Sequence, residues 1–265
     1  MTYQLPEHLR SEPWSQQLWT DVLQYGQLLD QLNHGIPREA TVIDVGGNIG
    51  FAAILFQQKY NATVYAIEAI PKTFSSLQQN CSRYPKINPI QTAIGSEQGT
   101  ISLYEYPLAS GLGGLDVSRW SIWKGLIREF SLSLSLSNSA NIVLFPFRCI
   151  GLLLWIFLAT LIILTRRTVR VEQESLSSVL KKCHPTGDID LIKIDIEGHE
   201  LQALQGISTT DWARTNVLIM EIHAVNIEPT YRLLDEHNFA ILKADSGPIK
   251  GPDSPRIVLA QRRLF

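Results

Sequence analysis

Short apolar runs rich in β-branched residues alternate with amphipathic segments along much of this chain, and this alternation constrains the fold more than any other feature. TVIDVGG (41–47) and ATVYAIEA (62–69) are each followed by a segment with helical spacing. The pattern returns later with DIDLIKIDIEG (188–198) and TNVLIMEIH (215–223). Strands that alternate with helices form a parallel sheet with helices on both faces. The sequence therefore predicts an α/β fold.

The remaining elements follow from the same patterns. An amphipathic helix is expected over 11–33, where Ser11 can cap it and Pro13 suits its first turn. The last two apolar runs, 239–245 and 256–263, are close enough in sequence to pair as an antiparallel hairpin. Further helices are expected over 48–60, 73–81, 199–207 and 229–238, a third strand over 87–95, and a hairpin-like run over 99–107.

Charge and cysteine content limit the partners and the compartment. The net charge is −2 and the pI is near 6.3, which disfavours nucleic acid because phosphate binding needs a concentrated basic face. Cys81, Cys149 and Cys183 have no metal-ligand spacing and cannot all pair, which favours a reduced compartment. The polar N-terminal stretch has no signal-peptide core, so we expect a cytoplasmic domain.

A cofactor site is predicted at the carboxyl ends of the first two strands, where ligands bind in open parallel sheets. The first strand ends in an acid and a glycine-rich turn, and we expect the next helix to begin near Asn48 with free N–H groups. The second strand ends in an acid that can accept hydrogen bonds from both hydroxyls of a ribose. The candidate cofactor residues are Asp44, Gly46, Gly47, Asn48, Gly50 and Glu68.

This combination favours a mononucleoside cofactor. A dinucleotide fingerprint opening at Gly46 would need glycine at position 48, which is asparagine here. The alternative for the glycines is a plain strand-to-helix connection, and for Glu68 a solvated strand-end carboxylate.

Four motifs, VIDVGGNIG, AIEAIP, LIKIDIEGHELQALQG and VLIMEIH, resemble the successive motifs of FkbM-type methyltransferases over roughly residues 40–110 and 168–245. The resemblance implies a class I methyltransferase fold (Rossmann-like), with a seven-stranded sheet that is mostly parallel and ends in an antiparallel C-terminal hairpin. It also implies S-adenosyl-L-methionine as cofactor and O-methylation of a sugar, polyketide or similar hydroxyl. The chain departs from the family pattern at Gly47, commonly alanine, and at Ala69, commonly proline.

Candidate catalytic groups follow the later two strands. Asp195 and Glu197 are two residues apart, as are Glu221 and His223, so in extended strands each pair would point the same way. Methyl transfer needs the acceptor oxygen aligned and its proton accepted. His223 is the favoured general base, oriented by Glu221 or Asp195, and His199 is its competitor.

Other roles remain open at this edge. Glu197 can position substrate hydroxyls or cap the next helix, while Glu200 is interpreted as a first-turn acid favoured by the helix dipole. Asp195, Glu197, Glu221 and His223 are also ligand types that magnesium or manganese accepts. No ligand spacing demands an ion, so no metal is expected.

The run from Cys149 to Leu164 carries no charge and interrupts the fold. A single membrane crossing would separate strands of one sheet, so the segment must return to the side it left. Arg119, Lys124 and Arg128 precede it, and Arg166, Arg167 and Arg170 follow, which places both ends on the cytoplasmic side. We expect a monotopic or re-entrant hairpin over 118–168; a buried core helix, or a lid over an apolar substrate, is the alternative.

Three parts are therefore expected: an N-terminal helical extension (1–39), a methyltransferase core (40–117 and 169–265) and a hydrophobic membrane-associating insertion (118–168). The expected activity is O-methylation of a hydroxyl on a sugar, glycolipid or other membrane-associated acceptor, at the cytoplasmic side of a membrane. The acceptor is a small molecule, a glycan or a lipid-linked compound, with no nucleic-acid or protein partner. The alternatives are a nicotinamide-dependent oxidoreductase and a non-catalytic membrane-tethered binding module.

Overall fold

The structure is a computed structural model of the whole chain, and it describes residues 3–10, 15–105, 160–161, 164–183, 187–246 and 255–263. The chain divides into two compact units, residues 1–101 with 170–265, and residues 102–169. Most of the predicted insertion, together with the predicted helix start at Ser11 and Pro13, lies outside the described residues.

The first unit is built on a seven-stranded sheet with the strand order β3-β2-β1-β7-β8-β10-β9. Neighbours from β3 to β8 pair in parallel, whereas β10 is antiparallel to both β8 and β9. This confirms the predicted Rossmann-like sheet with its antiparallel C-terminal hairpin. The strands are β1 (Thr41–Val45), β2 (Thr63–Glu68), β3 (Ile87–Gln91), β7 (Ile189–Ile194), β8 (Thr215–Ile222), β9 (Phe239–Ser246) and β10 (Arg256–Arg262).

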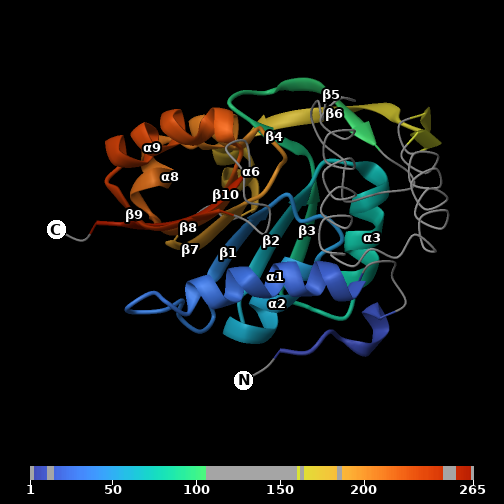
Figure 1. Cartoon of the computed structure of the whole chain (residues 1–265), viewed down its shortest axis with the longest axis horizontal. Helices are drawn as coiled ribbons and strands as arrows, with labels where there is room; N and C mark the ends of the chain where they lie inside the picture. Colours follow the sequence, from blue (N-terminus) through green and yellow to red (C-terminus); the bar gives the residue numbers. More distant parts are fainter. Residues whose placement is uncertain are drawn as a thin grey trace, which may run out of the picture. The chain divides into compact units, whose positions relative to one another are not determined.

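Helices cover both faces of this sheet, because successive residues of each buried strand point to opposite sides. In β1, Val42 belongs to the core under the N-terminal helices and Ile43 to the core on the other face. Figure 1 shows α1 and α2 on one side of the sheet and α8 and α9 on the other. The first face is covered by α1 (Ser15–Leu29), α2 (Phe51–Tyr60) and α3 (Pro71–Cys81), and the second by α6 (Leu176–Cys183), α7 (Glu200–Gln205), α8 (Thr209–Ala213) and α9 (Ile227–Glu236).

A second, three-stranded sheet was not predicted. It has the order β4-β6-β5, formed by β4 (Ala93–Gly95), β5 (Gly99–Glu105) and β6 (Arg167–Ser175). The run 87–95, expected as one strand, splits at Thr92: Gln91 pairs with Glu68 in the main sheet, whereas Ala93 pairs with Gln173 in the small one. The periodicity of the run gave no sign of this change of partner.

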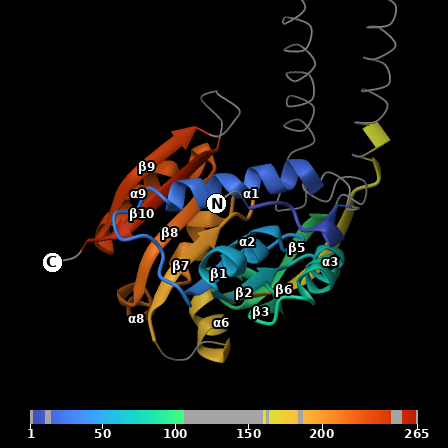
Figure 2. The same cartoon turned by 90° about the horizontal axis from the view of Figure 1, so that it is seen from below.

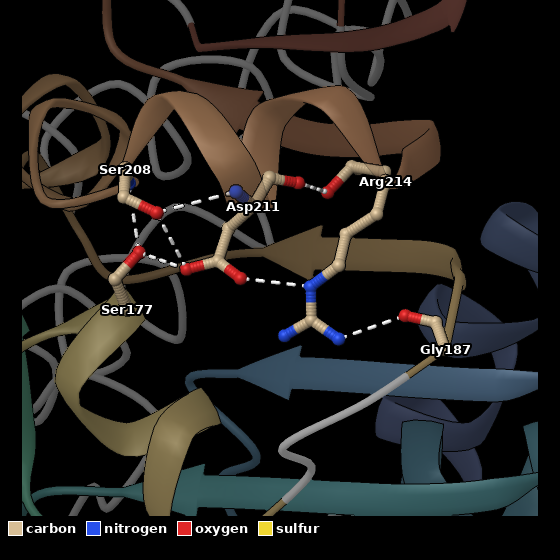
Figure 3. Close-up of polar contacts among 6 residues, drawn as sticks. Ser177, Gly187, Ser208, Asp211 and Arg214 are labelled. Atoms are coloured by element: carbon tan, nitrogen blue, oxygen red, sulfur yellow. Dashed lines mark hydrogen bonds and ion pairs between the residues drawn. The ribbon is translucent and has the colours of Figure 1, made fainter.

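A buried polar cluster fixes the start of β8, at the opposite end of the strand from the predicted site (Figure 3). Asp211 is 8% exposed and accepts hydrogen bonds from Ser177 Oγ, from Ser208 Oγ (2.9 Å) and from Arg214 Nε (2.8 Å). Arg214 also donates to the Gly187 carbonyl at 2.8 Å. Because the cluster joins α6, α8 and the loop before β7, its role is structural.

Candidate functional site

The turn after β1 is one that only glycine can form. Gly46 has φ +78°, and a Cβ there would lie 1.9 Å from the backbone oxygen of Asp195. Gly50 has φ +93°, and a Cβ there would meet Cys81 Sγ at 2.6 Å. The turn therefore packs directly against the end of β7, which brings the cofactor end and the chemistry end of the predicted site together.

Helix α2 begins at Phe51, three residues later than predicted. Asn48 is in the left-handed region with φ +47°, and its N–H donates to Glu68 Oε2 at 3.0 Å. The N–H groups of Gly46 and Gly47 both donate to the Ile67 carbonyl. We expected a helix that begins near Asn48 with free N–H groups at its amino end; the helix begins three residues later, and the N–H groups of Gly46, Gly47 and Asn48 are used within the turn.

Glu68 lies at the end of β2, beside the turn, and its carboxylate is well buried at 8% exposure. One oxygen accepts the Asn48 N–H and the other accepts the Ile70 N–H at 2.8 Å. Burial raises the pKa of Glu68 to about 7, although these hydrogen bonds oppose the shift. Each oxygen keeps a lone pair that a ligand hydroxyl can use.

A buried lysine that was not among the predicted site residues lies behind the turn. Lys193 is only 3% exposed. Its ammonium lies 3.1 Å from Asp44 Oδ1 and 3.5 Å from Asp195 Oδ2. It also donates a hydrogen bond to the Gly46 carbonyl at 2.8 Å. Burial alone would lower the pKa of Lys193, but the two carboxylates raise it overall. Asp44 is fully buried, and burial raises its pKa despite the attraction of Lys193.

Two buried polar atoms at this edge have no hydrogen-bond partner among the described residues: Asp44 Oδ2 and Asn48 Oδ1. Unpaired buried polar atoms are costly, and beside a ligand-binding edge they are positions where a ligand can supply the partner. Together with the Glu68 carboxylate and the close-packed turn at Gly46, they fit a nucleoside cofactor that carries hydroxyl and ammonium donors. S-adenosylmethionine has both, so the residues present fit the cofactor that the resemblance implies.

Asp195 and Glu221 lie side by side at the carboxyl edge, because Ile194 and Met220 are paired neighbours in β7 and β8. Asp195 is partly open to solvent, with a side chain 28% exposed. Burial raises the pKa of Glu221 to about 8, and the charges of Asp195 and Glu197 add to the shift. The edge therefore holds a carboxyl group that exchanges its proton near neutral pH.

His223 lies between two carboxylates on the loop and helix that follow β7. Its Nε2 is 3.5 Å from Glu197 Oε2, and its Nδ1 is 3.3 Å from Glu200 Oε1. These contacts raise the pKa of His223 to about 10. The sequence predicted Glu221 or Asp195 as the orienting partner, whereas in the structure Glu197 and Glu200 contact the imidazole.

The loop from Glu197 to Gly198 explains this difference. β7 ends at Ile194, and both Glu197 and Gly198 have left-handed backbones, with φ +52° and +102°. The prediction that Asp195 and Glu197 point the same way in an extended strand is therefore wrong. The fully buried Glu200 accepts the Gly198 N–H at 2.6 Å, and Asn226 Nδ2 donates to the Gly198 carbonyl at 2.9 Å. A non-glycine residue in this region is uncommon and indicates a loop held by its surroundings.

His199 directly precedes α7. Burial lowers its pKa, so its imidazole is neutral at physiological pH. It therefore differs from His223 in charge, although the two lie on neighbouring loops. Among the described residues, no group of three or more histidine, cysteine, aspartate or glutamate side chains is arranged to hold a metal ion.

Sequence reasoning missed three residues of this site: Lys193, Glu200 and Tyr25 of α1, whose hydroxyl donates a hydrogen bond to Asp195 Oδ2 at 3.0 Å. Lys193 had a usable signal, since it is the only charge within the buried run LIKI and a buried lysine requires a partner. Tyr25 had none, because its ring fits the apolar stripe of the first helix. Glu200 was interpreted as a dipole-favoured acid, and the loop geometry that buries it cannot be read from sequence.

Comparisons with known proteins identify the family of the chain. A family model described as the methyltransferase FkbM domain matches residues 44–241. Methyltransferase sdnD of Sordaria araneosa is 24% identical and aligns over 86% of this chain and 83% of its own. The 31-O-demethyl-FK506 methyltransferase FkbM of Streptomyces tacrolimicus is 27% identical and aligns over 87% of this chain and 85% of its own. The hexuronic acid methyltransferase AglP of Haloferax volcanii is 27% identical and aligns over 73% of this chain and 60% of its own. The chain belongs to the FkbM family of S-adenosylmethionine-dependent methyltransferases.

Proposed function

We propose that this methyltransferase transfers its methyl group to a hydroxyl oxygen, on a sugar, glycan, lipid-linked compound or other small molecule. The observation that carries the proposal is the edge formed by Asp195, Glu221 and His223, where groups that exchange protons adjoin the cofactor turn. An alcohol oxygen is a poor nucleophile until its proton is accepted, so O-methylation needs such a group. S-adenosylmethionine supplies the electrophilic methyl group.

The residues of the turn hold the cofactor in this proposal. Glu68 accepts hydrogen bonds from the ribose hydroxyls of the cofactor. The buried oxygens of Asp44 and Asn48 accept hydrogen bonds from other polar groups of the cofactor. The Lys193 ammonium keeps Asp44 from being an isolated buried charge, which would otherwise be strongly unfavourable. Lys193 also donates to the Gly46 carbonyl and so fixes the turn itself.

The choice of proton acceptor stays a prediction, and the structure changes its basis. His223 already carries a proton at neutral pH because its pKa lies near 10, so the imidazolium is better suited to stabilising negative charge on the acceptor oxygen. Glu221 has a pKa of about 8, so a fraction of it is ionised near neutral pH, unlike His223, which stays protonated; that ionised form is a stronger base than an ordinary carboxylate. We propose Glu221 as the proton acceptor, with neutral His199 as the alternative.

One relative supports an oxygen acceptor on a small molecule, because it is named a 31-O-demethyl-FK506 methyltransferase. A second relative is named a hexuronic acid methyltransferase, which gives a sugar acid as its acceptor and leaves the methylated atom unnamed. The charges at this site argue against an acidic acceptor for this chain, since the carboxylates of Asp195, Glu197 and Glu200 outnumber the two cations that contact them, His223 and Lys193. A neutral polyhydroxylated compound fits this edge best.

The test uses S-adenosylmethionine labelled in its methyl group. Purified protein is incubated with water-soluble and lipid extracts, and labelled products are separated and treated with mild alkali. An alkali-stable product that is heavier by one methylene supports an O-methyl ether. A labelled ester or amine instead would reject hydroxyl methylation. Glu221→Gln should abolish most labelling, whereas Glu236→Gln, an exposed change on α9, should label like the parent protein.

We further propose that the segment around the uncharged run contacts a membrane surface. Most of the run lies outside the described residues, but the end that is described exposes apolar side chains: Leu161 is 36% and Leu164 72% exposed. Arg167 and Arg170, which follow, are exposed cations suited to anionic headgroups. No helix among the described residues is long and apolar enough to cross a bilayer.

Fractionation of cells tests this proposal. The full-length protein should sediment with membranes, remain there in high salt and dissolve in detergent. Deletion of residues 120–165 with a short Gly/Ser bridge should release a protein that still binds S-adenosylhomocysteine. A full-length protein that stays in the supernatant without detergent would reject the membrane contact and favour a lid over an apolar substrate.

A further inference from the structure

The N-terminal helix α1 reaches the methyl-transfer site through one side chain. The Tyr25 hydroxyl donates a hydrogen bond to Asp195 Oδ2 at 3.0 Å, across 170 positions of sequence. Tyr25 is 6% exposed and lies before the part of the chain that the family model matches. The contact is therefore internal, and it joins the helix to the end of β7.

The helix that carries this hydroxyl is anchored to α2 on both sides of Tyr25. Next to Tyr25, the Gly26 carbonyl accepts a hydrogen bond from Lys59 Nζ of α2 at 2.7 Å, and the same ammonium pairs with Asp30 at 2.6 Å. One end of α1 further packs through Trp19 onto Phe51, the first residue of α2, with ring centroids 6.0 Å apart. Figure 2 shows the two helices lying against one another.

The hydroxyl completes a chain of contacts that ends at the cofactor turn. The Asp195 oxygen that accepts from Tyr25 also lies 3.5 Å from Lys193 Nζ, and the Tyr25 ring centroid lies 5.7 Å from that ammonium. Lys193 in turn donates to the Gly46 carbonyl. Tyr25 and Lys193 both contact Oδ2 of Asp195, so neither of them occupies Oδ1, and the side chain is 28% exposed.

We propose that Tyr25 is a positioning residue of the methyl-transfer site: it holds the Asp195 carboxylate in one orientation beside the cofactor turn, which makes α1 part of the catalytic unit. Tyrosine suits this task because it keeps its proton and acts only as a donor. Burial, reinforced by the Asp195 and Glu221 charges, raises its pKa well above the ordinary value. The inference rests on the proposed use of this edge for cofactor binding and methyl transfer.

The test is a double-mutant cycle on the affinity for S-adenosylhomocysteine, measured by titration calorimetry. Tyr25→Phe removes only the hydroxyl and should weaken binding about three- to tenfold. In an Asp195→Ala background the same change should have no further effect, because the acceptor is gone. A purely structural role for Tyr25 would weaken binding equally in both backgrounds.

Tyr60→Phe is the matched control. Tyr60 is 7% exposed, and its hydroxyl has no hydrogen-bond partner among the described residues, so this change removes the same atom without breaking a bond. It should bind like the parent protein. If Asp195→Ala does not fold, Asp195→Asn replaces it, and the Tyr25→Phe effect should fall to less than half.

Three results would overturn the inference. Tyr25→Phe could bind S-adenosylhomocysteine as tightly as the parent, or it could lose the same affinity in the parent and Asp195→Ala backgrounds. In the third, Tyr60→Phe would lose as much affinity as Tyr25→Phe. A parent protein that does not bind S-adenosylhomocysteine at all would instead overturn the proposed cofactor site, and the inference with it. The two failures are therefore distinguished by the first titration.

Discussion

Glu68→Gln tests the cofactor site through the charge of one side chain. The glutamine amide keeps the size of the carboxylate but offers one acceptor oxygen in place of two. The two Glu68 oxygens each accept a backbone N–H, from Asn48 and from Ile70. In the variant, the side-chain NH2 group therefore replaces one of these acceptors and faces a backbone N–H donor. Both the turn and the ribose contact should weaken.

The expected loss follows from hydrogen bonds to a charged acceptor, which are worth about 1.5–3 kcal/mol, or roughly ten- to hundredfold in cofactor affinity. The pH dependence is a sharper signature. With a pKa near 7, Glu68 of the free protein is ionised in about 9% of molecules at pH 6 and about 91% at pH 8. If the ionised form binds, affinity for S-adenosylhomocysteine should rise about tenfold between these pH values.

Titration calorimetry at pH 6, 7 and 8, in two buffers of different ionisation enthalpy, measures both the affinity and the proton released on binding. The parent protein should release a proton near pH 6 and bind more tightly as pH rises. Glu68→Gln should bind weakly at every pH with no proton release. The exposed Glu97→Gln serves as control and should follow the parent. A Glu68→Gln variant with parental affinity, or a parent with flat pH dependence, would refute the ribose assignment and its charge-based reasoning.

Lys193→Met should lower the free energy of unfolding by about 3–5 kcal/mol in urea titrations, because it leaves Asp44 as an uncompensated buried charge. Asp211→Asn should cost about 1.5–3 kcal/mol near pH 7. Burial raises the pKa of Asp211, but its hydrogen bonds lower the pKa further, so the folded pKa lies below 3.8. The stability that these hydrogen bonds contribute is therefore lost as pH falls below about 3.8, and there the thermal unfolding of parent and variant should converge. His223→Gln should flatten the alkaline limb of the stability profile: the folded pKa is raised from 6.5 to about 10, so the parent loses stability as pH climbs between these values.

The sheet was predictable because its signals are local and repeated. Each buried strand is a short run of β-branched residues, and the turn at Gly46 and Gly50 marks the carboxyl edge by a backbone conformation that other residues cannot adopt. The predicted cofactor residues do gather at this edge. Their hydrogen bonds were less predictable, since the Asn48 N–H was expected to be free and is instead held by Glu68.

The partners at the chemistry end depend on contacts between distant segments. Glu200 contacts His223 because Glu197 and Gly198 both have a left-handed backbone. In the sequence, only the glycine indicates such a turn. Tyr25 meets Asp195 because α1 crosses the sheet at one particular place. The strand at 167–175 was missed for a similar reason: it lies between β4 and β5, and the sequence pattern did not separate β4 from β3.

The order of strands in the sheet imposes an order on folding during synthesis. Val42 of β1 pairs with Val64, 22 residues later, but also with Leu191, 149 residues later. At about 5–20 residues per second, ribosomes need roughly 7–30 seconds to supply that second partner. Throughout this interval β1 presents an open, apolar edge, and the hydrophobic run at Cys149–Leu164 is completed while the edge is still bare. Newly made chains are therefore most exposed to aggregation in the window before Ile189–Ile194 leaves the ribosome, and chaperone occupancy should peak there.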